Sequence, residues 1–189
     1  DMSIAVVWSS ANTDGLTASA KDAFIEGIRE NGTDVEEIYL NGLKLEHCRA
    51  CGNGWGACRA KGVCIIKDDF EETYKKLAEA DGIVWITAVY WHDTTEVMKA
   101  FVDRLRRCET AHNGYLSQKR CFLAACAGGT GLGAVECLHN MEEALKHMGM
   151  RAYDRVPVIR FNKDYMLPAL REAGKIYAGR LVEGFDMRY

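Results

Sequence analysis

Half of the chain's eight cysteines lie in one short stretch, at Cys48, Cys51, Cys58 and Cys64. Thiols at this density can ligate zinc or an iron–sulfur cluster, and a Cys48–Cys51 pair can exchange electrons as a reversible disulfide. They can also be small apolar side chains in a loop, with Trp55 as a packing anchor. The residues alone leave these alternatives open.

The remaining candidates for chemistry are weaker. The other cysteines fall on expected helices or strands and are expected to pack in the core: Cys108, Cys121, Cys126 and Cys137. Of the five histidines only His92 lies in a loop selected below, so no histidine-based catalytic arrangement is predicted. Asp68 and Asp69 are expected to cap the helix that follows them.

Length and charge restrict the class of protein. We expect a single domain over residues 1–189, with a cysteine-rich loop insertion at about 46–69. The formal net charge is -3, and the only basic cluster is "RLRR", from Arg104 to Arg107, which is expected to be a solvated helix face, with the binding of an anionic ligand as the alternative. No nucleic-acid partner is therefore predicted.

The expected cellular compartment is inferred from the absence of membrane-spanning and signal-peptide patterns. No apolar run approaches the roughly 20 residues that span a bilayer, and no signal-peptide pattern is seen, so we expect a cytoplasmic protein without a membrane partner. In that compartment thiols stay reduced, which favours metal ligation or redox chemistry over structural disulfides.

Alternating patterns predict the elements that position these residues. Apolar runs predict five strands, at residues 3–8, 34–40, 83–87, 120–126 and 155–161. Apolar residues at helical spacing predict helices at 17–31, 68–82, 96–108, from the glycine-rich loop to about 148, and at 167–184. This alternation is typical of an α/β fold, a doubly wound parallel sheet with helices on both faces. Ligands of such sheets bind beyond the carboxyl ends of the strands.

The loop after the first strand, "SSANTDGLT", leads directly into a helix. Its small polar residues and glycine let backbone N–H groups approach an anion, and the helix N-terminus adds a partial positive charge. A phosphate group would fit here, although neither the G-x-G-x-x-G nor the P-loop pattern is present. The alternative is an ordinary Ser/Thr/Asn helix cap.

Two further loops follow the third and fourth strands. Tyr90 and Trp91 stand where a flat aromatic ligand would lie, although adjacent aromatics also occur in cores and partner interfaces. The fourth strand leads into "CAGGTGLGAVE", whose glycines let the backbone run close to a ring. Together the three loops predict a pocket for a phosphorylated, planar cofactor.

The order of these motifs resembles a known family. "SSANTDGLT", "AVYWHDTTEVMKAFVDR" and "CAGGTGLG" in succession look like the flavodoxin-like FMN reductases, and more closely like their iron-sulfur flavoprotein branch. In that branch a cysteine-rich loop follows strand two and ends in an acidic pair, as here. The resemblance implies a flavodoxin-like five-stranded sheet of order 2-1-3-4-5, bound FMN, electron transfer through the flavin, and a homodimer or homotetramer.

The resemblance also implies which residues hold FMN. The phosphate would lie against Ser9, Ser10, Asn12, Gly15, Leu16 and Thr17. The ring and ribityl chain would be lined by Ala88, Val89, Tyr90, Trp91 and His92, with Ala127, Gly128, Gly129 and Thr130 on the far side. The family usually has proline where this chain has Ala88, a change that adds an N–H near the flavin or loosens the turn.

The cysteine spacing departs from the pattern of the branch. Cys48 and Cys51 keep its first spacing and Cys58 to Cys64 resembles its last, but "GNGWGA" inserts extra residues between them. A 4Fe-4S cluster, free or redox-active thiols, and zinc all remain open for these four cysteines.

We therefore expect an FMN-dependent oxidoreductase. It would take electrons from NAD(P)H or a protein donor and pass them to a quinone, another small electrophile or a protein acceptor. The alternative is an electron carrier without a substrate of its own, which relays electrons between protein partners. A third alternative is a regulatory domain that has lost its flavin. It is disfavoured because all three loops keep the residues expected to bind the cofactor.

Overall fold

The computed structural model describes residues 1–112, 114–185 and 187. Its strands are β1 (Ser3–Ser9), β2 (Asp34–Tyr39), β3 (Gly82–Ala88), β4 (Arg120–Ala127) and β5 (Arg151–Ile159). Its longer helices are α1 (Leu16–Glu30), α4 (Phe70–Glu79), α5 (Glu96–His112), α6 (Ala134–Lys146) and α7 (Lys163–Glu183). Three short helical turns, η1 (Leu40–Gly42), α2 (Cys51–Gly54) and α3 (Ala57–Lys61), lie between β2 and α4.

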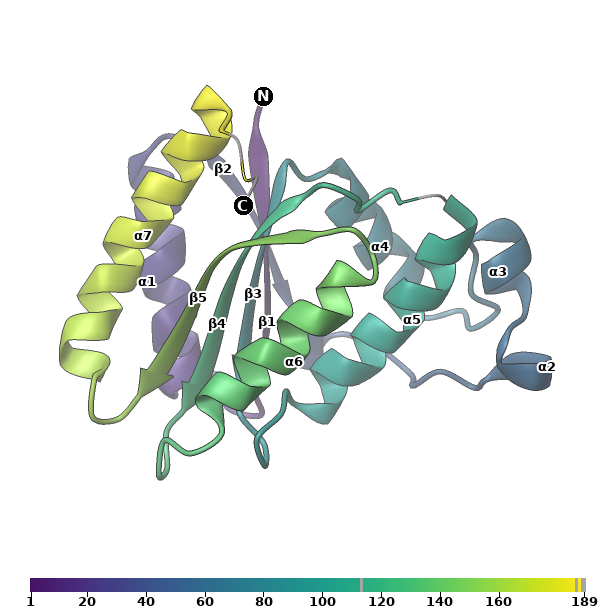
Figure 1. The fold of residues 1–189 in the computed structure, drawn as a ribbon, viewed down its shortest axis with the longest axis horizontal. Coiled ribbons are helices and arrows are strands. Elements are labelled where there is room, and N and C mark those ends of the chain that lie inside the picture. The colour runs from purple at the N-terminus through teal and green to yellow at the C-terminus, as the bar shows by residue number, and fades with distance from the viewer. Residues whose placement is uncertain (113, 186, 188–189) are drawn as a thin grey trace.

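The strands form one parallel sheet in the order β2-β1-β3-β4-β5 (Figure 1). This confirms the predicted fold class and strand order. The central strands β1, β3 and β4 are buried along almost their whole length, as continuous apolar runs covered by helices on both faces require.

Side chains of alternate residues in each strand point to opposite faces and build two cores. On one face, Val7, Trp85 and Leu123 pack against α4, α5 and α6. On the other face, Val6 and Phe122 pack against α1 and α7. Helices therefore cover both faces of the sheet, as the sequence predicted (Figure 1).

Two predicted boundaries were wrong at the C-terminal end of the chain. β5 begins at Arg151, four residues before the predicted start, because it is an edge strand whose partly exposed residues give little apolar signal. Pro157 is tolerated there because an edge strand has one unpaired side. α7 begins at Lys163 rather than Leu167, and its Pro168 lies inside the helix.

The predicted solvated face of "RLRR" was also wrong at its first residue. Arg104 is only 2% exposed and lies under the cysteine-rich segment, where it is paired with Asp68. The helical periodicity of α5 places Arg104 on the same buried stripe as Phe101 and Leu105, a position that a charged residue occupies only with a partner.

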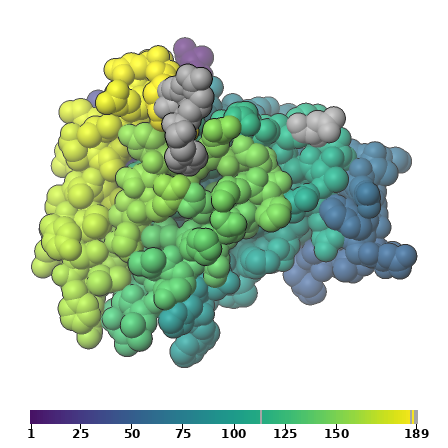
Figure 2. Space-filling view, viewed as in Figure 1, coloured from purple at the N-terminus to yellow at the C-terminus, as the bar shows by residue number. Residues whose placement is uncertain are grey.

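The two candidate sites lie in different parts of the molecule. The turns after β3 and β4 project together from the lower end of the sheet in Figure 1, whereas α2 and α3 lie beside α5, on the side away from α7. In the space-filling view the cysteine-rich segment forms the right-hand edge of the molecule (Figure 2). Within the described residues, none of the helices has the length and apolar character needed to cross a membrane.

Candidate functional site

The loop between β1 and α1 leaves the first turn of α1 without a side-chain cap. Gly15 is the N-cap residue, and it offers no side-chain acceptor to the N–H groups that follow. The first N–H groups of a helix have no partner within the helix, so they are available to an anion. Thr17 is buried in this turn and Leu16 is half-buried, while Asn12 is exposed beside Gly15.

Ser9 has a different environment from the rest of this loop. It is fully buried, and its hydroxyl lies 2.6 Å from both Asn41 Oδ1 and Thr95 Oγ1. Thr95 Oγ1 also accepts a hydrogen bond from Met98 N at 3.0 Å, which caps the start of α5. Ser9 therefore joins the end of β1 to the start of α5.

The loop after β3 is a tight turn closed by two backbone hydrogen bonds between Tyr90 and Asp93, of 2.8 and 3.1 Å. Both central residues, Trp91 and His92, are left-handed, with φ of 52° and 70°. Left-handed backbone is costly for residues other than glycine and is concentrated at functional sites. The turn leaves the Trp91 ring 96% exposed at the end of the sheet.

The glycine-rich loop after β4 faces this turn. Gly133 has a φ of 87°, and a Cβ on it would lie 2.6 Å from the Cα of His92, so the two loops touch through their backbones. A Cβ on Gly129, by contrast, would meet no atom of the described residues within 4 Å. Packing within the protein does not require a glycine at that position.

These two loops line a cleft of about 480 Å³, within the usual size of a small-molecule site. The cleft contains most of the predicted ring-binding residues: Val89, Tyr90, Trp91, His92, Ala127, Gly128, Gly129 and Thr130. The remaining predicted residue, Ala88, is the last residue of β3 and is only 9% exposed. The loop after β1 lies beside the cleft, where Ala11 N donates a hydrogen bond to Tyr90 Oη at 3.3 Å. The open glycine loop and the uncapped helix fit the ring and the phosphate of FMN.

Sequence reasoning missed the residues that hold these loops together. Tyr39 stacks on Trp8 with ring centroids 4.2 Å apart and donates a hydrogen bond to Ser10 O at 2.8 Å. Thr95 and Asn41 hold Ser9, and Leu132 lines the cleft. The position of Tyr39 at the end of β2 was a usable signal, whereas the pairing of Thr95 with Ser9 depends on how α5 packs.

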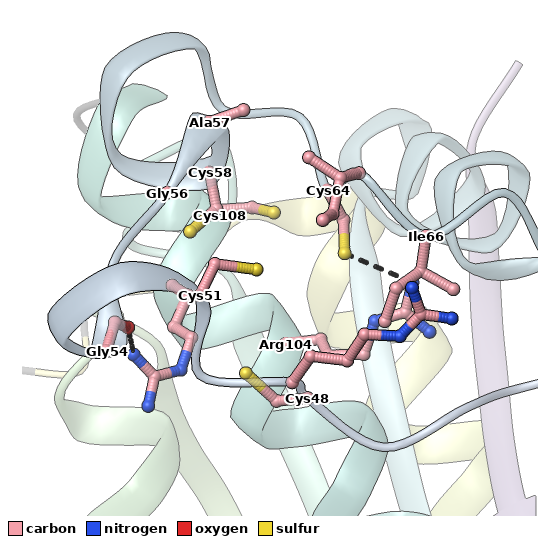
Figure 3. Close-up of a pocket in the computed structure, with 13 residues that line it drawn as sticks. Cys48, Cys51, Gly54, Gly56, Ala57, Cys58, Cys64, Ile66, Arg104 and Cys108 are labelled. Atoms are coloured by element: carbon pink, nitrogen blue, oxygen red, sulfur yellow. Dashed lines mark hydrogen bonds between the residues drawn. The ribbon is translucent and has the colours of Figure 1, made fainter.

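The cysteine-rich segment forms a second pocket. Cys48, Cys51, Cys58 and Cys64 are half-buried free thiols that line it together, and α5 contributes Cys108 (Figure 3). Burial and the nearby Cys58 and Cys64 raise the pKa of Cys108 to about 12, so its thiol stays protonated. The expected core role of Cys108, Cys121, Cys126 and Cys137 is confirmed by their burial.

The donor chemistry of this pocket suits a soft metal, because four thiols surround one space. In the part of the chain that the structure describes, however, no three Cys, His, Asp or Glu side chains converge closely enough to hold a metal ion. The thiols therefore suit a soft metal by their chemistry, while among the described residues their positions do not form a closed metal site.

The acidic pair closes the base of this segment. Asp68 Oδ1 accepts a hydrogen bond from Phe70 N at 3.1 Å, so it caps α4 as predicted. Asp69 stands at the N-cap position, but its side chain accepts from Lys44 N at 2.6 Å instead of from the helix. The carboxylates therefore also join the two ends of the segment.

A parallel sheet in this order, with a cleft beyond the carboxyl ends of its strands, defines the flavodoxin-like class of proteins. Residues 2–162 match the family model of the NADPH-dependent FMN reductases, and the chain belongs to this family.

Curated relatives resemble part of the chain. It is 31% identical over 91 residues to an iron-sulfur flavoprotein of Archaeoglobus fulgidus, an alignment that covers 48% of this chain and 40% of the relative. It is 34% identical over 82 residues to an iron-sulfur flavoprotein of Methanosarcina thermophila, covering 43% and 41%. The matched region thus spans less than half the length of each of these two relatives.

Solved structures share the fold over nearly the whole chain. A flavone reductase superposes with a TM-score of 0.74 at 18% identity, covering 99% of this chain and 66% of its own. An archaeal flavodoxin superposes with a TM-score of 0.65 at 18% identity, covering 96% and 99%. At this level of identity the likeness shows the fold alone.

Proposed function

We propose that this chain is an FMN-dependent oxidoreductase that takes electrons from NAD(P)H and passes them to a quinone or another small acceptor. The observation that carries the proposal is the meeting of three loops at one edge of the sheet, with an uncapped helix N-terminus beside an open glycine loop. Family membership supports it, because the family is described as NADPH-dependent FMN reductases.

The residues of the cleft have distinct parts in this proposal. The N–H groups at the start of α1 would bind the FMN phosphate, and Asn12 and Thr17 flank it. Tyr90, Trp91 and the backbone at Gly128 and Gly129 would orient the ring. FMN, when bound, supplies the electron chemistry, and the protein supplies binding and orientation.

The test is a titration of the cofactor-free chain with FMN, followed by fluorescence and visible absorption. We expect saturable quenching of the flavin fluorescence and the oxidation of NADPH or NADH when a quinone is added. A folded chain that gains no flavin bands in excess FMN contradicts the proposal.

We further propose that Cys48, Cys51, Cys58 and Cys64 hold a 4Fe-4S cluster. The support is the single pocket they line and the names of the curated relatives. Iron, zinc and acid-labile sulfide are measured in anaerobically purified protein. Cys51→Ala is expected to lose iron, whereas the matched core variant Cys121→Ala keeps it. Wild-type protein that contains zinc but no acid-labile sulfide would contradict the cluster proposal.

An electron carrier that serves two protein partners is the second candidate. The observation that favours it is the separation of the thiol pocket from the cleft, because each could serve a different partner. Steady-state turnover of NAD(P)H with a simple quinone favours the enzyme. Flavin that is reducible by dithionite but not by either nucleotide favours the carrier.

Assembly into a homodimer or homotetramer is also a proposal. Trp91, Leu132 and Val135 are large apolar side chains exposed around the cleft, at 96%, 70% and 68%. A second copy would cover them. Light scattering of the purified chain tests this, and a monomer at micromolar concentration contradicts it.

A further inference from the structure

Helix α5 holds the cysteine-rich segment by its backbone at three points. Arg104 Nη1 donates to Glu46 O at 3.0 Å, Arg107 Nη1 donates to Gly54 O, and His112 Nε2 lies 3.0 Å from Gly62 O. These three carbonyls are spread along the segment that carries the four thiols. The shape of the thiol pocket is therefore set from outside the segment, by side chains of α5.

Arg104 is the most deeply buried of these three side chains. Its side chain is 1% exposed and that of its partner Asp68 is 5% exposed. The guanidinium makes two hydrogen bonds to this carboxylate, of 2.7 and 3.0 Å, and Asp68 Oδ2 also accepts from Glu46 N at 2.8 Å. Arg104 and Asp68 together fasten the beginning of the segment to its end.

The same guanidinium reaches one of the four thiols. Arg104 Nη2 lies 3.4 Å from Cys64 Sγ, a contact drawn in Figure 3. The guanidinium also lies over the Phe70 ring, 4.3 Å from its centroid, which restricts its movement. Its Nε–H is buried without a hydrogen-bond partner among the described residues, at the wall of the thiol pocket.

We propose that Arg104 is a positioning residue of the thiol pocket. It fixes the Cys64 sulfur and places a buried positive charge beside any group that the four thiols hold. The proposal rests on the proposed cluster only for its effect on reduction potential. Its effect on the position of Cys64 belongs to the chain itself.

Two physical effects follow from this placement. An N–H donor to a ligating sulfur and a nearby positive charge both stabilise the more negative, reduced state of an iron–sulfur group, which raises its reduction potential. Lysine would keep the charge but could not reproduce the guanidinium's simultaneous contacts with Asp68, Glu46 O and Cys64. Position and charge can therefore be tested separately.

Position is tested in iron-free, reduced protein with Arg104→Lys, which retains the charge. The rate of iodoacetamide alkylation at Cys64, relative to Cys48, is measured by peptide mass spectrometry. We expect the ratio to rise several-fold in Arg104→Lys and to stay at the wild-type value in Arg106→Met, a control two residues away. A ratio equal to wild type in folded Arg104→Lys overturns the positioning role.

Charge is tested in iron-loaded protein by comparing Arg104→Lys, which keeps the charge, with the double variant Arg104→Met/Asp68→Asn, which removes both charges of the pair and the N–H donor to Cys64; Arg104→Met alone would leave an unpaired buried carboxylate. Because the lost positive charge and donor lie directly at the Cys64 sulfur, an anaerobic redox titration is expected to give the double variant a midpoint potential more negative than that of wild type, of Arg104→Lys and of Arg106→Met. An unchanged potential overturns the charge role. If wild type takes up no iron, the cluster proposal fails, and the alkylation ratio still decides the role of Arg104.

Discussion

Gly133 and His92 lie so close that a Cβ on Gly133 would be 2.6 Å from the Cα of His92. This backbone contact joins the loop after β4 to the turn after β3, and together the two loops line the cleft. The geometry of the cleft thus depends on a glycine that is not one of the residues lining it.

Two glycine variants separate this packing role from a binding role. Gly133→Ala is expected to lower the free energy of unfolding by about 1–3 kcal/mol, because it combines a left-handed backbone with a clash. Gly129→Ala is expected to leave the free energy of unfolding within about 0.5 kcal/mol of wild type, since its Cβ meets no atom in the described part of the chain, and yet to weaken FMN binding. Urea unfolding measures the stability of both variants, and FMN titration measures their affinity for the cofactor. An unchanged FMN affinity in Gly129→Ala would contradict the placement of the flavin ring against this loop.

The left-handed backbone of Trp91 in the turn after β3 predicts that a glycine there raises the free energy of unfolding but lowers the affinity for FMN. Trp91→Gly is expected to raise the free energy of unfolding by roughly 0.5–1 kcal/mol, because glycine adopts φ > 0 without the cost that tryptophan bears. It is also expected to weaken FMN binding several-fold by removing an aromatic ring from the cleft. Gln118→Gly, at φ of 67° in another turn, is the matched control and should gain stability with unchanged FMN affinity.

The helix N-terminus predicts a charge effect at Asn12. Asn12→Asp places a carboxylate beside the uncapped start of α1, where the helix dipole favours it in the cofactor-free protein. We expect equal or higher thermal stability without FMN and a loss of FMN affinity of about 1 kcal/mol or more, which corresponds to at least a several-fold change. Asn140→Asp, exposed on α6, controls for net charge. Tighter FMN binding in Asn12→Asp would contradict a phosphate site there.

The buried ion pair predicts a pH dependence of stability. Burial alone would raise the pKa of Asp68, but hydrogen bonds from Arg104 and from the N–H groups of Glu46 and Phe70 hold this pKa below its usual value. The unfolded chain therefore binds the proton first as the pH falls. The stabilisation of the folded chain by ionised Asp68 is therefore complete above the pKa of an aspartate in the unfolded chain, about 3.9, and is lost progressively below it.

Urea unfolding between about pH 3 and pH 6 measures this effect. Asp68→Asn is expected to be less stable than wild type at neutral pH and to show a shallower loss of stability in acid. Asp164→Asn, which removes an exposed carboxylate on α7, is expected to keep the wild-type slope. A slope in Asp68→Asn as steep as that of wild type would contradict the assignment.

The sequence by itself determined the sheet and the place of the cleft. Continuous apolar strands that alternate with amphipathic helices admit few arrangements, and the carboxyl ends of parallel strands must meet at one edge. The loops that carry Tyr90 and Gly128 are therefore placed side by side by the sequence pattern alone. The start of β5 could not, because an edge strand buries too little apolar surface to mark its own boundary.

Only the tertiary structure decided what surrounds the thiols. In the sequence, Arg104 lies 40 positions from Cys64, and its pattern predicts an exposed arginine. In the fold, its side chain is buried between Asp68 and the Cys64 sulfur. Helical periodicity tells which residues share a stripe, but it does not tell which distant segment covers the stripe. The pairing of Ser9 with Thr95 and the contact of Gly133 with His92 arise in the same way, from the packing of elements that local patterns do not encode.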